Sequence, residues 1–301
     1  MNTHSCLLPT LALGLLALTP LSVRAIVISD DFSSYTASDT TNLSGTSSGQ
    51  LGHSNGFGPI GAGWLRGWRS SSNNTGGTTS AYVLDTNPLL VGGNYFSYTV
   101  TTVAGNGVAT SSLLRPYDAT GVSVGGTTAF STRFDFRADS VTGSVRFNLS
   151  NSNSRTASYD GTATWVLSAY DGYWYAGNGA GDNFVSTGLA FETGVTYSIA
   201  IHENPETLRW SVSISDGATS RTLTDLNFRT SVWATGGGDS IADSRWLTFA
   251  AAEVFSGTSV GASATFSVDN IQISTVPEPA AVALIFGAAI IGFAALRRRW
   301  Q

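Results

Sequence analysis

Alternation of apolar and polar residues dominates the middle of the chain and predicts β-strands. In FSTRFDFRA, which spans Phe130–Ala138, the phenylalanines and the last alanine fall on one face, and Ser131, Arg133, Asp135 and Arg137 fall on the other. A side-chain period of two is typical of a half-buried strand in an antiparallel sheet. The segment SVRFNLS that follows has the same period and predicts a second strand.

A β-hairpin is predicted in the segment TYSIAIHENPETLRWSVSISDG. Apolar residues alternate with polar residues on both of its arms, and the turn is expected near Asn204–Thr207. Glu203 and Glu206 lie at this tip, where we expect them to be exposed to solvent. Asp135 and Asp139, on the polar face of the earlier strand, are expected to form exposed ion pairs with neighbouring arginines.

Several other segments show strand patterns, and together they predict an all-β protein. They are Tyr82–Asp85, Tyr95–Val103, Thr110–Leu114, Thr164–Tyr170, Leu223–Phe228, Trp246–Ala250 and Ala264–Ile273. In the last of these the apolar phase shifts at Asp269-Asn270, which predicts a β-bulge. The region Thr36–Thr79, including SSSNNTGG, has a loop-like composition. About ten strands with Gly, Asn and Asp turns favour one antiparallel β-sandwich or jelly roll over a barrel.

Both ends of the chain differ from this middle. Leu7–Leu18 is apolar and is followed by Pro20 and by small residues at Val23 and Ala25. This arrangement predicts a secretory signal peptide over residues 1–25, with a buried N-terminal helix as the alternative. The β-sandwich domain is then expected over residues 26–275.

The C-terminal end combines an apolar segment with a basic cluster. Ala280–Leu296 carries no charge and would span about 25 Å as a helix, enough for a short transmembrane helix. Arg297, Arg298 and Arg299 follow at once, and three guanidinium groups are costly to move across a bilayer. We therefore expect residues 297–301 to stay in the cytoplasm. A buried helix of the soluble domain is the alternative.

The residues before the apolar segment are Val276, Pro277, Glu278 and Pro279. Pro-Glu-Pro, an apolar span and a terminal arginine cluster, together spanning residues 276–301, resemble the PEP-CTERM sorting signal of Gram-negative bacteria. The resemblance implies processing by an exosortase after transient anchoring in the inner membrane. It also implies release to the cell surface or to an exopolysaccharide biofilm matrix, and it makes residues 276–279 the recognition motif.

The middle domain resembles the concanavalin A-like and laminin-G-like jelly rolls. The similar segments are DDFSSY, GAGWLRGW, VLDTNPLLVGGNYFSYT, FDFRADS and FSVDNIQI, in that order along the chain. The resemblance implies that the first and last strands pair in one sheet. It includes no catalytic motif.

Composition narrows the classes of partner. The chain has 15 basic residues, all arginine, and 20 acidic residues. Removing the four arginines and the one glutamate outside residues 26–275 leaves 11 against 19, a net charge near −8. This charge disfavours nucleic acids and anionic lipid surfaces. The one cysteine, Cys6, lies in the leader, so no disulfide is expected in the domain.

The sequence contains no recognisable catalytic constellation. Sandwich glucanases carry alternating carboxylates on one strand, and this pattern is absent here. His53 and His202 are the histidines outside the leader, and neither stands in a Gly-x-Ser-x-Gly context. The domain is therefore expected to be non-catalytic. The alternatives are a secreted hydrolase or lyase with an unrecognised site, and a purely structural envelope protein.

Two kinds of ligand site remain as candidates. Oxygen-rich turns at Asn178–Asn183, Tyr159–Thr162 and Val268–Asn270 could hold a structural calcium ion, or they are ordinary turns.

Exposed aromatics could bind polysaccharide, because sugar C–H faces pack on flat rings. The candidates are Tyr173, Trp174 and Tyr175, together with Trp64 and Trp68. Consecutive residues of a strand point to opposite sides, so either Trp174 or its two neighbours should face outward. The alternative is that these rings fill the core or cover a sheet edge.

The predicted processing can be tested on protein recovered from the producing cells. Mass spectrometry of the intact protein should find Ile26 at the N-terminus and a C-terminus close to residues 277–279. A full-length chain with Met1 and Gln301 both present in the cell interior would contradict both the leader and the sorting tail.

Overall fold

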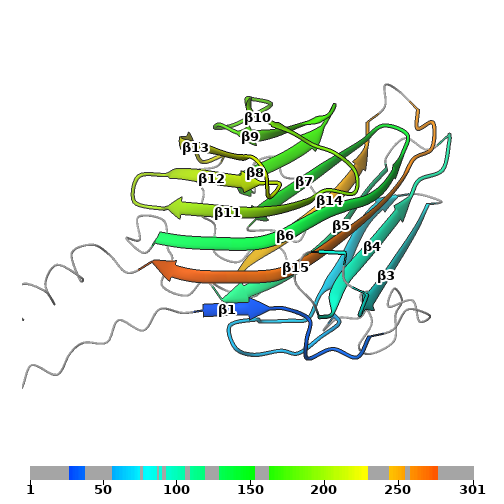
Figure 1. The fold of residues 1–301 in the computed structure, drawn as a ribbon, viewed down its shortest axis with the longest axis horizontal. Coiled ribbons are helices and arrows are strands. Elements are labelled where there is room, and N and C mark those ends of the chain that lie inside the picture. Colours follow the sequence, from blue (N-terminus) through cyan, green and yellow to red (C-terminus); the bar gives the residue numbers. More distant parts are fainter. Residues whose placement is uncertain are drawn as a thin grey trace, which may run out of the picture. The chain divides into compact units, whose positions relative to one another are not determined.

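The alternating segments pair into two antiparallel β-sheets in the computed structural model of the chain (Figure 1). The structure describes residues 27–37, 56–74, 77–86, 88–89, 93–105, 109–118, 129–152, 163–229, 244–254 and 258–276. The predicted signal peptide and C-terminal helix lie outside these ranges. Within them, no helix has the length and apolar character needed to cross a membrane.

The first sheet contains both end strands of the described chain. Its order is β13-β12-β11-β6-β15-β4-β3, and β1 pairs with β15 beside this path. The strands are β1 (Val27–Asp30), β3 (Thr78–Leu84), β4 (Tyr95–Thr101), β6 (Ala129–Thr142), β11 (Thr196–Asn204), β12 (Arg209–Ser215), β13 (Ser220–Asn227) and β15 (Ser263–Val276). Pairing of β1 with β15 confirms that the first and last strands share a sheet.

The second sheet faces the first and is built from the remaining strands. Its order is β10-β9-β8-β7-β14-β5-β2. The strands are β2 (Arg69–Asn74), β5 (Ala109–Asp118), β7 (Val145–Ser152), β8 (Ala163–Tyr170), β9 (Tyr173–Gly177), β10 (Phe184–Ala190) and β14 (Ser244–Glu253). All strand pairs in both sheets are antiparallel. The predicted all-β antiparallel sandwich is therefore confirmed.

Two local predictions have different outcomes. The bulge at Asp269-Asn270 is present, because the register of β15 on β6 shifts between Asp269 and Gln272. The extra residue keeps both halves of the strand facing the core: Val268 and Ile271 are both buried. The loop prediction for SSSNNTGG is wrong, since Arg69–Asn74 forms β2. Backbone pairing with β5 stabilises this strand, and the polar sequence of the segment gives no indication of that pairing.

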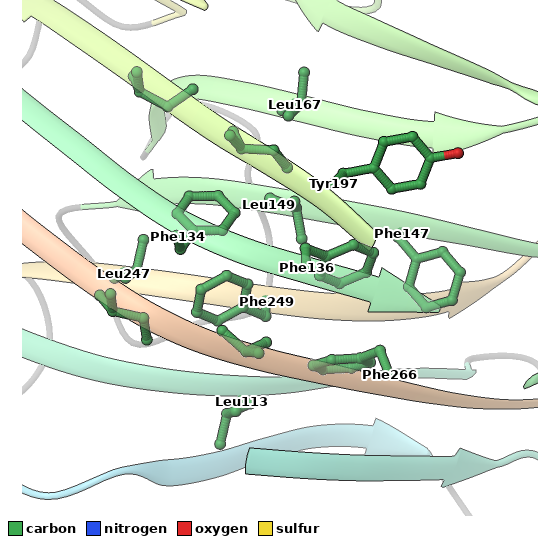
Figure 2. Packing of buried hydrophobic residues seen from close by; sticks show 14 of the residues in the cluster. Leu113, Phe134, Phe136, Phe147, Leu149, Leu167, Tyr197, Leu247, Phe249 and Phe266 are labelled. Atoms are coloured by element: carbon green, nitrogen blue, oxygen red, sulfur yellow. The ribbon is translucent and has the colours of Figure 1, made fainter. Parts of the chain in front are cut away.

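Aromatic rings from the two sheets meet edge to face in the interior (Figure 2). Phe134 of β6 contacts Phe249 of β14, with ring centroids 5.1 Å apart and planes at 87°. Phe136 of β6 meets Phe147 of β7 at 5.5 Å and 70°. Such pairs add about 0.5–1.5 kcal/mol each to the free energy gained by burying the rings. The core therefore stabilises the domain without help from disulfides.

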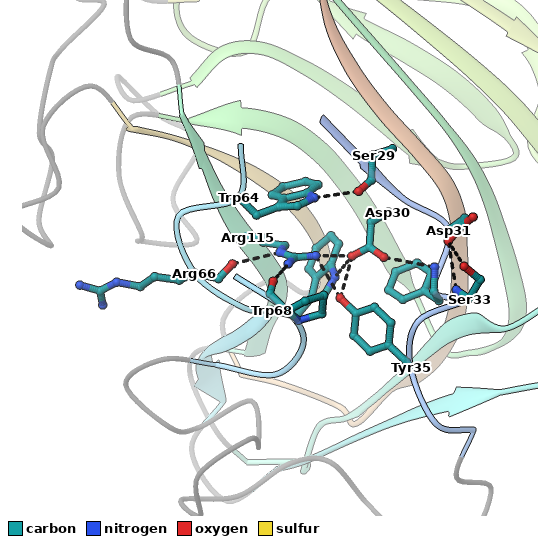
Figure 3. A network of polar contacts seen from close by, with 11 residues as sticks. Ser29, Asp30, Asp31, Ser33, Tyr35, Trp64, Arg66, Trp68 and Arg115 are labelled. Atoms are coloured by element: carbon teal, nitrogen blue, oxygen red, sulfur yellow. Dashed lines mark hydrogen bonds and ion pairs between the residues drawn. The ribbon is translucent and has the colours of Figure 1, made fainter. Parts of the chain in front are cut away.

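A buried ion pair attaches the N-terminal segment to the second sheet (Figure 3). The guanidinium of Arg115 on β5 donates to Asp30 at the end of β1 and to the hydroxyl of Tyr35, and both Arg115 and Asp30 are buried. Tyr35 and Trp68 also donate to Oδ2 of Asp30, at 2.8 Å and 2.9 Å. Burial raises the pKa of the Tyr35 hydroxyl, which therefore remains a hydrogen-bond donor.

Removing the cation from this network should strongly destabilise the fold. Arg115→Ala leaves the Asp30 carboxylate buried without its charged partner, and we expect the free energy of unfolding to fall by about 3–5 kcal/mol. Tyr35→Phe removes one hydroxyl and should cost about 1 kcal/mol. Denaturant titration measures both. Arg133→Ala on an exposed face is the control, expected within about 0.5 kcal/mol of the unsubstituted protein. A loss below 1 kcal/mol for Arg115→Ala would contradict this role.

Candidate polysaccharide-binding surface

Trp64 and Trp68 do not form an exposed pair. Both are buried, at 3 % and 0 % exposure. The indole of Trp64 donates to the carbonyl of Ser29 at 3.0 Å, and the guanidinium of Arg115 lies 4.3 Å above its ring. The two tryptophans therefore serve the Asp30–Arg115 network, and neither ring face is available to a sugar.

The segment Tyr173-Trp174-Tyr175 obeys the alternation of a strand. Trp174 is fully buried and packs edge to face on Phe136 and Tyr197. It is thus a core residue rather than a binding residue. Tyr173 and Tyr175 point outward, with Tyr173 48 % exposed and Tyr175 half-buried.

Tyr175 belongs to a larger set of stacked side chains on the outer face of the second sheet. Its ring stacks on Tyr170 of β8, with centroids 4.4 Å apart and planes at 24°. The guanidinium of Arg146 lies 4.7 Å from the Tyr170 ring and 4.6 Å from the Phe184 ring. The guanidinium of Arg229 lies 5.4 Å from the same Phe184 ring. We call these five residues, together with Tyr173, which faces Tyr170 across β8 and β9, the arginine–aromatic ladder.

Strand register explains why the ladder assembles. Asn148 faces Ser168 across β7 and β8, so Arg146 and Tyr170 are neighbours one step along the same face. Tyr170 in turn faces Tyr173 across β8 and β9. Phe184 faces Gly177, which has no side chain, so the Arg229 side chain packs over this glycine and reaches the Phe184 ring.

The ladder offers flat rings and a cation on one solvent-facing surface. Tyr170, Tyr175, Phe184 and Arg146 are half-buried, so part of each remains in contact with solvent. Sugar C–H faces pack on such rings, and the tyrosine hydroxyls and the guanidinium can hydrogen-bond to sugar oxygens. Cation–π contacts hold the arginine in place and so reduce the entropy lost on binding.

Sequence reasoning found part of this surface and missed the rest. The sequence predicts Tyr173 and Tyr175 as candidates because three aromatics in a row must split between the two faces of a strand. Arg146, Phe184 and Arg229 lie on different strands and loops, and no sequence spacing indicates that they meet.

Glu203 is buried, and the expectation that it is exposed is wrong. It is 0 % exposed, and its carboxylate accepts hydrogen bonds from Nδ2 of Asn151 at 3.0 and 3.1 Å. Asn151 also donates to the hydroxyl of Tyr117 at 2.8 Å. Burial raises the pKa of Glu203, opposed by the positive charge of Arg245. Strand alternation places residue 203 inward even though the hairpin turn follows one residue later.

Glu253 is the second buried glutamate, and it fastens loops at one end of the sandwich. Its carboxylate accepts hydrogen bonds from the hydroxyls of Thr102 and Ser259 and from the backbone N–H groups of Val260 and Gly261, at 2.5–2.9 Å. Burial tends to raise the pKa of Glu253, but these four donors outweigh it and lower the pKa. With all its acceptor capacity used, this carboxylate has a structural role.

The calcium candidates and surface carboxylates have local partners. Across the turn Asn178–Asn183, the Asn183 amide donates to the Asn178 carbonyl at 2.6 Å. Asp269 accepts from the N–H of Asn270 at 2.7 Å within the bulge, and residues 159–162 lie outside the described ranges. Among described residues, no three His, Cys, Asp or Glu side chains gather as a metal site. Of the expected ion pairs, Arg137 contacts Asp139 at 3.1 Å.

Comparison with known proteins gives structural similarity only. No family model and no curated protein matches the chain. Lectin II from Ulex europaeus is 14 % identical with a TM-score of 0.39, covering 70 % of this chain and 98 % of the lectin. An endo-β-1,4-glucuronan lyase from the fungus Trichoderma reesei is 15 % identical with a TM-score of 0.41, covering 71 % and 93 %. A protein of unknown function from Shewanella oneidensis is 12 % identical with a TM-score of 0.43, covering 69 % and 78 %.

Burial of Glu203 should make stability depend on pH. Because its pKa is raised in the folded protein, the folded state holds this proton more tightly than the unfolded state does. The free energy of unfolding should therefore fall as pH rises from the ordinary value of 4.5 to the shifted pKa, by about 1.4 kcal/mol per pH unit.

Glu203→Gln keeps the size and hydrogen bonding of the protonated acid and should remove this pH-dependent part. Glu206→Gln at the exposed turn is the matched control. Urea titrations between pH 4 and 8 make the comparison. Parallel pH profiles for the unsubstituted protein and Glu203→Gln would contradict the assignment.

Proposed function

We propose that the chain is an exported cell-surface or extracellular-matrix protein that binds polysaccharide through the arginine–aromatic ladder. The leader and the tail supply the route: export past residue 25, transient anchoring by residues 280–296, and exosortase recognition at residues 276–279. The ladder supplies the binding surface. The domain acts by binding rather than by catalysis.

The observation that carries this proposal is the exposed tyrosine face around Tyr173 and Tyr175. Burying an aromatic ring is strongly favourable, yet Tyr173 keeps 48 % of its surface in solvent while it continues the row of Arg146 and Tyr170. Its neighbours in the ladder are fixed by stacking, so a ligand would meet a surface that is already ordered.

The ends of the domain are compatible with processing at the proposed motif. Val276, the first motif residue, is also the last residue of β15 and pairs with Ala129. A cut beyond Val276 would therefore leave every described strand intact. Val27 pairs with Ser274, so leader and tail join the domain on neighbouring strands.

Binding and its dependence on the ladder can be measured on purified full-length protein. The probes are a bacterial exopolysaccharide preparation and the soluble β-glucan laminarin, and retention and released reducing ends are followed together. We expect retention without cleavage. Tyr173→Ala should weaken binding about 2–10-fold, which corresponds to losing roughly 0.5–1.5 kcal/mol of aromatic packing.

Tyr82→Ala, which removes a half-buried tyrosine from β3 in the first sheet, is the matched control and should bind as the unsubstituted protein does. Unchanged binding by Tyr173→Ala together with Tyr175→Ala would reject the ladder as the site. Cleavage that a single Asp or Glu substitution abolishes would replace the binding function by a glycan-active enzyme.

A further inference from the structure

The outer face of the first sheet is hollowed at two neighbouring places. One hollow, of about 370 Å³, is lined by Arg133, Asp135, Ser198, Ser213, Asn270 and Gln272, among others. The second, of about 570 Å³, is lined by His202, Asn204, Arg209, Ser211, Thr224 and Asp225, among others. Both lie on the face of the molecule that is opposite to the ladder, because the two sheets turn their outer faces away from each other.

Register shows that the two hollows continue one another along β11 and β12. Ala200 of β11 faces Arg133 on one side and Ser213 on the other. Two residues further along β11, and therefore on the same face, His202 faces Ser131 and Ser211. The two hollows lie end to end on this face, and together we call them the β11–β12 trough. From Ser198 to Asn204 it runs about 20 Å at the usual rise of a strand, long enough for several sugar units.

The floor of the trough is made of small side chains, and planar polar groups stand along its sides. Ala200 and the serines of β11 and β12 form the floor. Asp135 is held in place on one side, since it accepts hydrogen bonds from Ser198 at 2.6 Å and from Asn270 at 2.8 Å. The side chain of Arg133 beside it is exposed.

Backbone strain is concentrated at the borders of the trough. Asp225 and Asn270 line it with φ values of 60° and 52°, and Leu208, between the lining residues Thr207 and Arg209, has a φ of 55°. These are three of the six non-glycine residues in the described ranges with left-handed φ. Asn270 lies in the β15 bulge, Asp225 lies where the register of β13 on β12 shifts, and Leu208 ends the hairpin turn, so bends of the backbone border the trough.

We propose that the trough binds a linear, uncharged polysaccharide chain. A fixed carboxylate and amide, with guanidinium and imidazole groups beside them, along a floor of alanine and serine suit a polyhydroxylated ligand. In the trough, the charges of Arg133 and Arg209 are balanced by those of Asp135 and Asp225. The domain as a whole has a net charge near −8, so neither the trough nor the domain attracts a polyanion. Together with the ladder, on which this part of the proposal rests, the domain would hold two chains on opposite faces and cross-link them.

The test uses full-length protein in a zwitterionic detergent that has no sugar headgroup. Calorimetric titrations with cellohexaose, laminarihexaose and chitohexaose report affinity and stoichiometry, and hexagalacturonate is the anionic probe. Ala200→Glu fills the floor and faces Arg133 across the strand pair, where opposite charges favour folding. Thr78→Glu, at an exposed outward position of β3, is the matched control.

We expect about two hexasaccharides per chain for the unsubstituted protein and Thr78→Glu, and about one for Ala200→Glu and for Tyr173→Ala with Tyr175→Ala. Light scattering with long laminarin should show cross-linked complexes for the unsubstituted protein and none for Ala200→Glu.

Four outcomes decide between the sites. Unchanged stoichiometry in Ala200→Glu would overturn the trough and leave the ladder standing. Loss of all binding in the variant with Tyr173→Ala and Tyr175→Ala would also overturn the trough as a binding site. Binding that Ala200→Glu abolishes and the tyrosine substitutions do not affect would support the trough and reject the ladder. Sensitivity to Ala200→Glu with hexagalacturonate alone would overturn the uncharged ligand class.

Discussion

The alternation of side chains along the fifteen strands of the described residues constrains everything else in this domain. The strands point alternate side chains into the interior, and the interior is filled by rings that meet edge to face across the two sheets. Trp174 is used in this way, and Trp64 and Trp68 are buried around the Asp30–Arg115 network. The proposed recognition of polysaccharide therefore falls to the outer faces, where tyrosine, arginine and small polar residues remain.

Buried polar groups in this interior each connect segments that are distant along the chain. Asp30 joins β1 to Arg115 on β5, and Glu203 joins β11 to Asn151 on β7. Glu253 on β14 joins Thr102, which directly follows β4. Burying a carboxylate without a partner costs free energy. The observed pairing of strands is therefore favoured over pairings that would leave these groups without partners. The aromatic core supplies stability, while these pairs favour one register.

The outer faces of the two sheets differ in their chemistry. The second sheet presents stacked rings held by guanidinium groups, which offer area for C–H contacts. The first sheet presents a trough with a floor of alanine and serine, which offers hydrogen-bonding groups in fixed positions. The difference arises from residue size: β9 and β10 place large rings outward, whereas β11 and β12 place Ser and Ala outward. A single domain thus carries two surfaces suited to different modes of contact.

The sequence by itself determined the all-β class, the hairpin at Asn204–Thr207, the bulge at Asp269-Asn270 and the division of Tyr173-Trp174-Tyr175 between two faces. Each of these follows from local periodicity, which a sequence displays directly. Only the tertiary structure decided that Ser70–Asn74 is a strand, that Glu203 is buried, and that Arg146, Phe184 and Arg229 meet. These depend on which strands become neighbours and in which register, and strand pairing joins residues whose distance along the chain carries no periodic signal.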